Sequence, residues 1–448
     1  MDADEISNLF ERLFPIQRSL TGDGNRRSLD ILSEVTPLNR TEVPAGTSVY
    51  DWTVPPEWNV DEAWIRDGSG ETVVDVATNT LHLVNYSVPM EATLSFDELE
   101  PHLYTLPEMV DTIPYRTSYY ERDWGFCLRQ NTFDEMDRDE TYEVRIDAEL
   151  DEEGSLTYAD ARVEGKSERE YVLSTYCCHP SMANDNLSGL ILATLLFERI
   201  RQSDPYHSYR LIIVPETIGA IAYLHDHERA MKSVDGGYVV TTTAGPGSFG
   251  YKESFRGDHP VDTAARLALD SYDYDQYDFA PTGSDERQYS TPGFRIPTGS
   301  ITKDKYYEYD AYHTSEDDLS FVSADALERT LEIYWDAIQY LEMDRVYTRR
   351  QPHCEFKLDR HDLHPTTGGQ KHQPAHLGDE SHSEHDYGDD ETVTTGDVQD
   401  GINWLMFGCD GETSLFALAE QSGLSVLTLF RAAQALQDAD LIVPVEVS

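Results

Sequence analysis

The segment at residues 171–189 constrains the fold of this chain more than any other part of the sequence. Residues 171–178 form a short, almost unbroken run of apolar and β-branched side chains, which is typical of a strand buried on both faces. The run ends at His179, and a proline follows. Asp185 lies in an Asn-Asp-Asn sequence before a segment, 187–200, with helical apolar spacing, and we expect these side chains to cap that helix. The pattern predicts an imidazole and a carboxylate at the sheet edge where α/β proteins bind ligands.

Strands and helices alternate through the middle of the chain. We expect further strands at 210–214, 237–242 and 300–302, and helices at 187–201, 218–229, 260–270 and 324–341. Earlier runs at 124–128, 141–150 and 156–163 are predicted as strands of the same sheet, and short helices are expected at 4–17 and 25–32. The alternation predicts an α/β fold with a doubly wound, mostly parallel sheet and helices on both of its faces.

A different pattern, of short strand-like runs separated by turn residues, occupies residues 44–112. The runs lie at 49–54, 62–65, 72–75 and 81–86, and Asp67-Gly-Ser-Gly between two of them is typical of a hairpin loop. We therefore expect an inserted small β domain at 44–112, within a larger domain formed by residues 1–43 and 113–350.

The last hundred residues contain two further segments. Residues 351–391 hold seven histidines among Gly, Pro and acidic residues without periodicity, which favours a flexible acidic linker over a metal-binding tract. Residues 392–448 predict a helix, a glycine turn, a second helix and a strand, which resembles a winged helix-turn-helix domain. Because 391–448 carries nine acidic residues and the second helix has one basic residue, Arg431, we expect a packing or protein-contact module rather than DNA binding.

The charge of the chain is extreme, with 84 acidic and 34 basic residues and a net charge of -50. Acidic residues spread over the whole sequence indicate a halophilic cytoplasm, with an acidic interaction surface as the alternative. Such a field repels nucleic acid and anionic membranes, so we expect neither as a partner. Five cysteines, an acidic N-terminus and the lack of a long apolar run predict a cytoplasmic protein that does not span a membrane.

Two ionisable residues follow neighbouring predicted strands. His179 follows one strand and Glu216 follows the strand at 210–214, so both are expected at the same edge of the sheet. Imidazole and carboxylate together suit a divalent metal such as zinc. Glu216 is a candidate general base toward water made more acidic by a metal, although it could instead cap the helix that follows.

Two later segments carry similar side chains. Asp285 and Glu286 lie in a glycine turn, and His313 lies directly before a predicted helix capped by Ser315 or Asp317.

Five short sequences, in this order, resemble the zinc-dependent aminopeptidases of the bacterial leucyl aminopeptidase and glutamate carboxypeptidase type. They are Cys-Cys-His-Pro, Asn-Asp-Asn-Leu-Ser-Gly, Pro-Glu-Thr-Ile-Gly, Gly-Ser-Asp-Glu-Arg-Gln-Tyr and Tyr-His-Thr-Ser-Glu-Asp. Within that group the chain looks most like a little-characterised aminopeptidase-like family with an inserted β domain and a C-terminal winged helix. The resemblance implies that His179 and His313 are metal ligands, that Asp185 is the carboxylate that bridges two metals in those enzymes, and that Glu216 is their general base.

The chain also departs from that pattern. Thr217 and Ser181 stand where the enzymes have acidic residues, and Thr241-Thr242-Thr243 lacks the aspartate that would complete a second metal site. The resemblance therefore implies one divalent ion, with zinc favoured over iron or another metal.

Other residues are weaker candidates for metal or substrate binding. Asp285 or Glu286 could add a metal ligand or bind a substrate amine, and Arg256 and Tyr289 could contact a substrate carboxylate or oxyanion. The adjacent cysteines 177 and 178 could present a thiolate to the metal, but their place on a buried strand favours core packing.

Our first hypothesis is a metal-dependent hydrolase of amide bonds, an aminopeptidase acting on a peptide or a small N-acyl substrate. The alternatives are a catalytically impaired metal-binding scaffold and a DNA-binding regulator that uses the C-terminal segment. A homo-oligomer is also a candidate, with the C-terminal segment and the β domain as surfaces.

Overall fold

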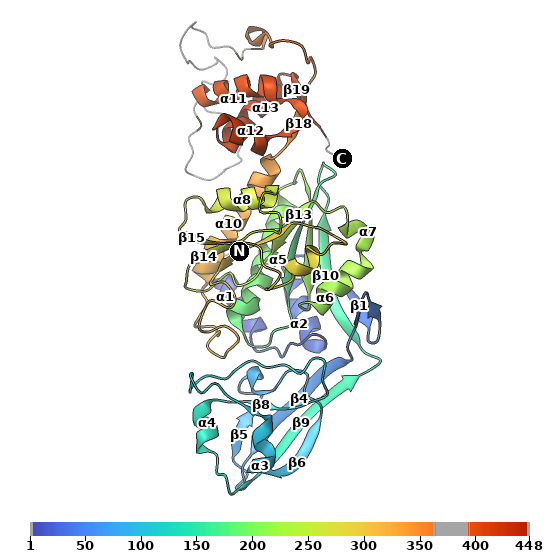
Figure 1. The fold of residues 1–448 in the computed structure, drawn as a ribbon, viewed down its shortest axis with the longest axis vertical. Coiled ribbons are helices and arrows are strands. Elements are labelled where there is room, and N and C mark those ends of the chain that lie inside the picture. Colours follow the sequence, from blue (N-terminus) through green and yellow to red (C-terminus); the bar gives the residue numbers. More distant parts are fainter. Residues whose placement is uncertain (1–2, 362, 364–392, 394, 446–448) are drawn as a thin grey trace.

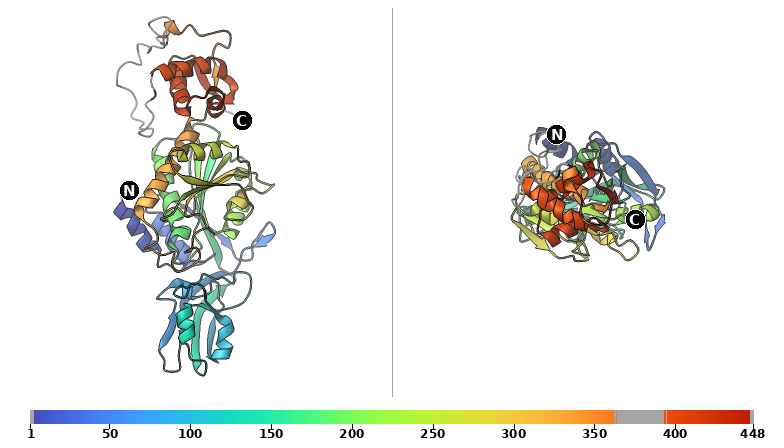
Figure 2. Two further views of the ribbon diagram at one scale, coloured as in Figure 1. Left: turned by 60° about the vertical axis from the view of Figure 1, so that its left-hand side comes forward. Right: turned by 90° about the horizontal axis from the view of Figure 1, so that it is seen from above.

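A computed structural model describes residues 3–361, 363, 393 and 395–445, and shows three units along its long axis (Figure 1). A small sheet lies at one end, an eight-stranded sheet with helices on both faces lies in the middle, and a mainly helical unit lies at the other end (Figure 2). Most of the segment predicted as a histidine-rich linker lies outside the described residues.

The elements follow in chain order. The helices are α1 (Ala3–Leu13), α2 (Asp23–Leu32), η1 (Thr80–His82), α3 (Phe96–Leu99), η2 (Glu100–His102), α4 (Gln130–Glu135), η3 (Ala183–Ser188), α5 (Gly189–Gln202), α6 (Ile218–Asp226), α7 (Glu228–Met231), α8 (Pro260–Leu269), α9 (Glu286–Tyr289), α10 (Ala324–Met343), η4 (Leu358–Arg360), α11 (Thr395–Gly408), α12 (Leu415–Ser422) and α13 (Val426–Asp438). In the described part of the chain, none of these helices has both the length and the apolar character needed to cross a bilayer.

The strands are β1 (Asn39–Pro44), β2 (Ser48–Val49), β3 (Trp52–Thr53), β4 (Glu57–Arg66), β5 (Thr72–Asp75), β6 (Met90–Ser95), β7 (Leu103–Tyr104), β8 (Phe126–Cys127), β9 (Thr141–Asp151), β10 (Ser155–Val163), β11 (Glu170–Tyr176), β12 (Ser208–Val214), β13 (Gly236–Val239), β14 (Phe249–Lys252), β15 (Tyr274–Tyr277), β16 (Thr298–Lys303), β17 (Val346–Arg349), β18 (Asp410–Ser414) and β19 (Ile442–Val445).

The central sheet has the order β1-β10-β12-β11-β13-β16-β14-β15, and its four middle strands β12, β11, β13 and β16 are parallel. Successive residues of β11 enter different cores, since Leu173 packs with the helices on one face and Val172 packs on the other. Burial on both faces explains the continuous apolar run that predicts this strand. The predicted large, mostly parallel α/β sheet is therefore confirmed.

The second sheet, of order β5-β4-β9-β6, contains one strand that we expected elsewhere. β9 pairs with β4 and β6, so the prediction that residues 141–150 belong to the central sheet is wrong. β8 pairs with β7, so the same prediction for 124–128 is also wrong. The alternation of buried and exposed residues in β9 identifies a strand but does not specify the sheet that it joins. The hairpin at Asp67-Gly-Ser-Gly is confirmed between β4 and β5.

In the C-terminal unit, the two helices around the glycine turn and the final strand lie where the sequence predicts them, and the strand β18 was not predicted. Ser414 and Ser425 accept hydrogen bonds at the starts of α12 and α13, and Gly423 ends α12 with a φ of 69°. The strand β19 follows, and it pairs with β17 from the end of the long helix α10. This pairing connects the C-terminal unit to the chain that leaves the central sheet.

Arg26 of α2 links the two sheets. Its guanidinium donates to both oxygens of Glu57 on β4 at 2.6 and 2.7 Å, and to Glu42 on β1 and Ser155 on β10. The hydrogen bonds from Arg26 lower the pKa of Glu57 to about 2, against the opposing effect of burial. The bidentate pair therefore favours the folded state whenever the carboxylate is ionised.

We predict that Glu57→Gln lowers the free energy of unfolding by about 2 kcal/mol at pH 7, because a charged hydrogen-bonded pair is lost. The folded pKa of Glu57 lies below its ordinary value of 4.5, so this stabilisation is complete above that value and decreases as the pH falls toward 2. Urea melts at pH 7 and pH 3 should show a smaller difference at pH 3. Glu34→Gln, which removes an exposed ion pair with Arg12, is the control. If Glu57→Gln lowered the free energy of unfolding equally at pH 7 and pH 3, the proposed dependence on the pKa of Glu57 would be wrong.

Candidate metal centre

The turn after β11 holds the loops around it in place. Asn184 Oδ1 accepts from the backbone N–H of Ala244 at 2.9 Å, and Asn186 donates to the carbonyl oxygen of Tyr176 at 3.1 Å. These side chains therefore bond to neighbouring strands and loops, and the prediction that they cap the following helix is wrong. These asparagine side chains form hydrogen bonds with residues distant in sequence, in place of the backbone N–H groups of the adjacent helix.

Gly189 explains why this turn ends in glycine. A Cβ atom there would lie 2.2 Å from Asn186 Oδ1 and 2.5 Å from the carbonyl oxygen of Val240. The first turn of α5 therefore approaches the end of β13 more closely than any other residue would permit.

Asp185 is completely buried within η3. Its Oδ1 accepts a hydrogen bond from the Tyr176 hydroxyl at 2.6 Å, and its Oδ2 lies 3.0 Å from His313 Nε2. Its backbone N–H donates to Asp317 Oδ2 at 2.9 Å. Burial opposes ionisation, but His179, His313 and Tyr176 lower the pKa of Asp185 to about 2, so this group is an anion at neutral pH.

His313 lies in a turn region rather than before a helix. Its φ is 56°, and the next helix, α10, begins only at Ala324 with Ser323 as its N-cap. The expected helix capped by Ser315 or Asp317 is therefore absent from this described region. Asp317 instead accepts the backbone N–H groups of Asn184 and Asp185, which joins the two ligand-bearing turns.

His179 lies just beyond β11 and is almost completely buried. The buried Arg18 donates from Nε to the His179 carbonyl oxygen at 2.8 Å, which fixes the backbone at this point. Burial lowers the pKa of His179 to about 4, so its imidazole is neutral at neutral pH. The rings of His179 and His313 lie 5.4 Å apart.

The three side chains fit a metal ion. One potential ligand atom from each of His179, Asp185 and His313 lies within 4.8 Å of the others. Among the described residues, neither Asp185 Oδ2 nor His313 Nε2 has a hydrogen-bond partner, although they lie close together. Unpaired buried donors and acceptors are rare in folded proteins, and an anionic carboxylate beside neutral imidazole is a donor set that divalent cations bind.

Glu216 lies beside this group, just beyond the end of β12. Its Oε2 is 3.9 Å from His179 Nε2, and burial and then the nearby Asp285 and Asp185 raise its pKa well above the ordinary value. Within the described residues α6 receives no side-chain cap, so the capping alternative for Glu216 is not supported. A carboxylate with a raised pKa is a stronger base than a solvated one.

The turn at residues 284–287 contacts Thr217, the residue that follows Glu216. Asp285 Oδ1 accepts the backbone N–H of Thr217 at 2.8 Å, and Arg287 donates to the Thr217 hydroxyl at 2.9 Å. Burial raises the pKa of Asp285 to about 7. Asp285 thus lies next to the base, in contact with the backbone that carries it.

The other weaker candidates lie elsewhere. Glu286 forms a buried pair with Lys252, and Tyr289 is a core residue whose hydroxyl bonds to Ser174. Arg256 is exposed and pairs with Asp258. The structure does not bring these three side chains to the cavity beside His179.

A cavity of about 310 Å³ opens onto His179, Glu216 and His313. Its wall is formed by aromatic side chains that the sequence analysis did not select, namely Trp52, Tyr115, Tyr119 and Tyr120. The loop that carries the three tyrosines is attached to the His313 turn, since the Tyr115 N–H donates to the His313 carbonyl oxygen at 2.9 Å. Tertiary contacts of this kind, which also include the Tyr115 ring against the rings of His179 and His313, relate the tyrosine-rich run to the site.

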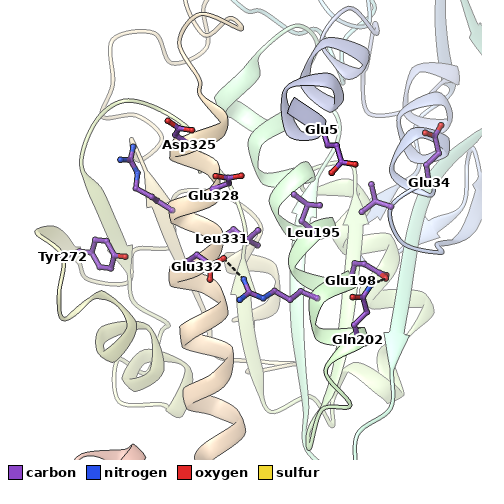
Figure 3. A pocket seen from close by; sticks show the side chains of 13 residues that line it. Glu5, Glu34, Leu195, Glu198, Gln202, Tyr272, Asp325, Glu328, Leu331 and Glu332 are labelled. Carbon is purple, nitrogen blue, oxygen red and sulfur yellow. Dashed lines mark hydrogen bonds and ion pairs between the residues drawn. The ribbon is translucent and has the colours of Figure 1, made fainter. Parts of the chain in front are cut away.

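A larger cavity lies elsewhere, between α1, α5 and α10 (Figure 3). Its volume is about 1000 Å³, and it contains none of the predicted site residues. Its lining is rich in carboxylates, including Glu5, Glu198, Asp325 and Glu328. The acidic lining of this cavity agrees with the acidic composition of the chain. The predicted residues His179, Glu216 and His313 line the smaller cavity instead.

Comparisons with known proteins agree with this description. The family model "Domain of unknown function (DUF4910)" matches residues 7–344. A Clostridium acetobutylicum protein described as "Putative polysaccharide biosynthesis protein with aminopeptidase-like domain" is 40% identical over 440 residues, which are 98% of this chain and 96% of that protein. A crystal structure described as "putative peptidase" from the same species has a TM-score of 0.85 and 39% identity, and the match covers 99% of this chain and 96% of that one.

Two more distant crystal structures share the fold. A zinc aminopeptidase from Bacillus subtilis has a TM-score of 0.54 and 12% identity, with 76% of this chain and 95% of that chain covered. A peptidase M28 precursor from Shewanella amazonensis has a TM-score of 0.53 and 13% identity, with 75% and 92% covered. The α/β fold of this chain is therefore similar to that of aminopeptidases.

We predict that the protein binds one equivalent of Zn²⁺ and that Asp185→Asn abolishes this binding, because Asp185 is the anionic member of the group. A hundredfold excess over the dissociation constant should stabilise the wild type by about 3 kcal/mol. Elemental analysis and thermal melts with and without Zn²⁺ provide the measurement.

Asp325→Asn, in the acidic cavity, is the control for non-specific binding to carboxylates. Two equivalents per chain would contradict a single-ion centre, and none would contradict the centre itself.

Proposed function

We propose that this chain, which belongs to the family described as Domain of unknown function (DUF4910), is a metal-dependent hydrolase of amide bonds. The observation that carries the proposal is the buried Asp185 carboxylate, which faces two imidazoles with one oxygen lacking a hydrogen bond among the described residues. The aminopeptidase-like fold supports the same class of reaction.

His179, Asp185 and His313 would hold a single divalent ion, zinc in our proposal. When bound, the ion supplies a Lewis acid that polarises an amide carbonyl and makes water more acidic. Thr217 supports a single ion, because its hydroxyl is bonded to Arg287 and it offers no carboxylate.

Glu216 is the proton carrier in this proposal. Its side chain lies at the cavity floor beside His179, and about a quarter of it is exposed there. It would take a proton from the attacking water and deliver it to the leaving amine. The contact between Asp285 and the Thr217 backbone keeps the segment that carries Glu216 in place.

The aromatic wall would bind the side group of the substrate. Trp52 and Tyr120 meet edge to face at 5.6 Å and are both solvent-accessible, so they present ring surface to the cavity. A volume of about 310 Å³ suits a terminal peptide residue or a small N-acyl compound. We propose these as the substrate classes of the site.

Three further features of the chain enter the proposal. The small sheet would form an inserted β domain that extends past residue 112, since β9 completes it. The unit at 395–445 would be a winged-helix-like module for packing or protein contact, supported by the arrangement of α12, α13 and β19. The net charge of -50 supports a halophilic, cytoplasmic protein without nucleic acid or membrane partners, and the module and β domain offer surfaces for a homo-oligomer.

We predict that Glu216→Gln lowers kcat at least about a hundredfold, because an amide cannot accept the proton, while Zn²⁺ binding is retained. Hydrolysis of a panel of aminoacyl amides and N-acyl compounds by the zinc-loaded protein provides the measurement. Glu308→Gln, an exposed glutamate, is the control. Equal rates for the wild type and Glu216→Gln would favour the catalytically impaired scaffold instead.

We predict that Trp52→Ala raises KM about tenfold and changes kcat little, since ring contacts of about 1.4 kcal/mol bind substrate and transition state alike. Steady-state kinetics on the best substrate of the panel test this. Trp404→Ala, which removes a similarly exposed indole from α11, should leave KM unchanged. A fall in kcat at constant KM would refute a binding role for the wall.

A further inference from the structure

We propose that Cys178 is a positioning residue whose sulfur fixes both His179 and Glu216. The inference rests on the proposed metal centre and adds Cys178, a buried residue that contacts both His179 and Glu216. Cys178 Sγ lies 3.4 Å from His179 Nδ1 and accepts the backbone N–H of Glu216 at 3.3 Å. One sulfur atom therefore contacts the ring of a metal ligand and the backbone of the base.

In our assignment, the Nδ1–H of His179 donates to the Cys178 sulfur, and this contact sets which ring nitrogen is available. A neutral imidazole carries one N–H and one lone pair. With Nδ1–H directed at the sulfur, Nε2 keeps its lone pair, and Nε2 is the atom that lies 3.9 Å from Glu216 Oε2 at the cavity. A metal-ligating histidine needs such a partner on its other nitrogen, and Cys178 provides it here.

The contact with Glu216 connects the ends of two parallel strands. β11 and β12 are neighbours, and each carries its functional residue just past its last paired residue. Beyond that point, the Cys178 sulfur receives the N–H of Glu216 and takes the place of a further backbone hydrogen bond. The distance between the ligand and the base is thereby set by a side chain.

Cys177 provides a matched comparison within the same dipeptide. Both cysteines are about 1% exposed, yet Cys177 packs in the core on one face of the sheet and Cys178 on the other. Cys178 lines the cavity beside His179 and Glu216. Replacing either cysteine by alanine removes one buried sulfur atom, so a difference between the two variants reports the contacts of Cys178.

A direct metal–sulfur bond is the competing arrangement, because Cys178, His179 and Glu216 also offer ligand atoms within 4.8 Å of one another. Our assignment has the sulfur on the Nδ1 side of the ring, behind the ligand rather than beside the metal. Cobalt substitution distinguishes the two arrangements, since a bound thiolate produces an intense charge-transfer band in the near ultraviolet. We expect no such band, and its presence would overturn the assignment.

The principal experiment compares Cys178→Ala, Cys178→Ser, Cys177→Ala and the wild type. Competition with a chromophoric chelator should show Zn²⁺ affinity lowered about 10- to 100-fold in Cys178→Ala and within about twofold of the wild type in Cys177→Ala. Cys178→Ser, which keeps an acceptor, should recover part of the loss. Equal affinity in Cys178→Ala and Cys177→Ala would overturn the inference.

A second measurement does not depend on the metal. Nitrogen-15 NMR of histidine-labelled, metal-free protein should show His179 as the Nδ1–H tautomer in the wild type and in Cys177→Ala. Cys178→Ala should lose this preference, and an unchanged tautomer would overturn the inference. If the wild type shows the tautomer effect but binds no metal, the proposed function fails while the role of Cys178 stands.

Discussion

The buried carboxylate of Asp185 is the constraint on which the rest of the site depends. Transferring an anion out of water costs several kcal/mol unless other groups compensate its charge. The Tyr176 hydroxyl compensates one oxygen, while the other faces His313 at 3.0 Å without a hydrogen bond among the described residues. A cation between this oxygen and the two imidazoles would complete the compensation, which is why the structure favours a metal centre over a structural polar cluster.

Hydrogen bonds to the backbone hold the segments around Asp185 in place. Asp317 accepts the N–H groups of Asn184 and Asp185, Arg18 donates to the carbonyl of His179, and the Cys178 sulfur accepts from Glu216. Each of these contacts joins segments that are distant in sequence or carried by different strands. The side chains of the candidate metal centre are therefore held in place because the turns that carry them are bonded to one another.

Chemistry and shape come from different parts of the molecule. His179 and Glu216 lie just beyond the carboxyl ends of β11 and β12, where open α/β sheets bind ligands, and Asp185 lies in η3, which follows β11. The aromatic wall comes from the β2–β3 hairpin and from the tyrosine-rich loop that contacts the His313 turn. The connections between elements therefore shape the cavity, while the central sheet carries the residues of the candidate metal centre.

The sequence by itself determined the local features whose causes are local: the buried strand β11, the α/β alternation, the C-terminal helices on either side of Gly423, and the side chains at strand ends. These follow from the period of the apolar residues and from the residues that end each element. Only the tertiary structure decided which sheet β9 joins, that the Asn-Asp-Asn side chains bond outside their helix, and that Arg256 and Tyr289 lie away from the cavity. Those outcomes depend on contacts between residues far apart in the chain, and such contacts leave no periodic trace in the sequence.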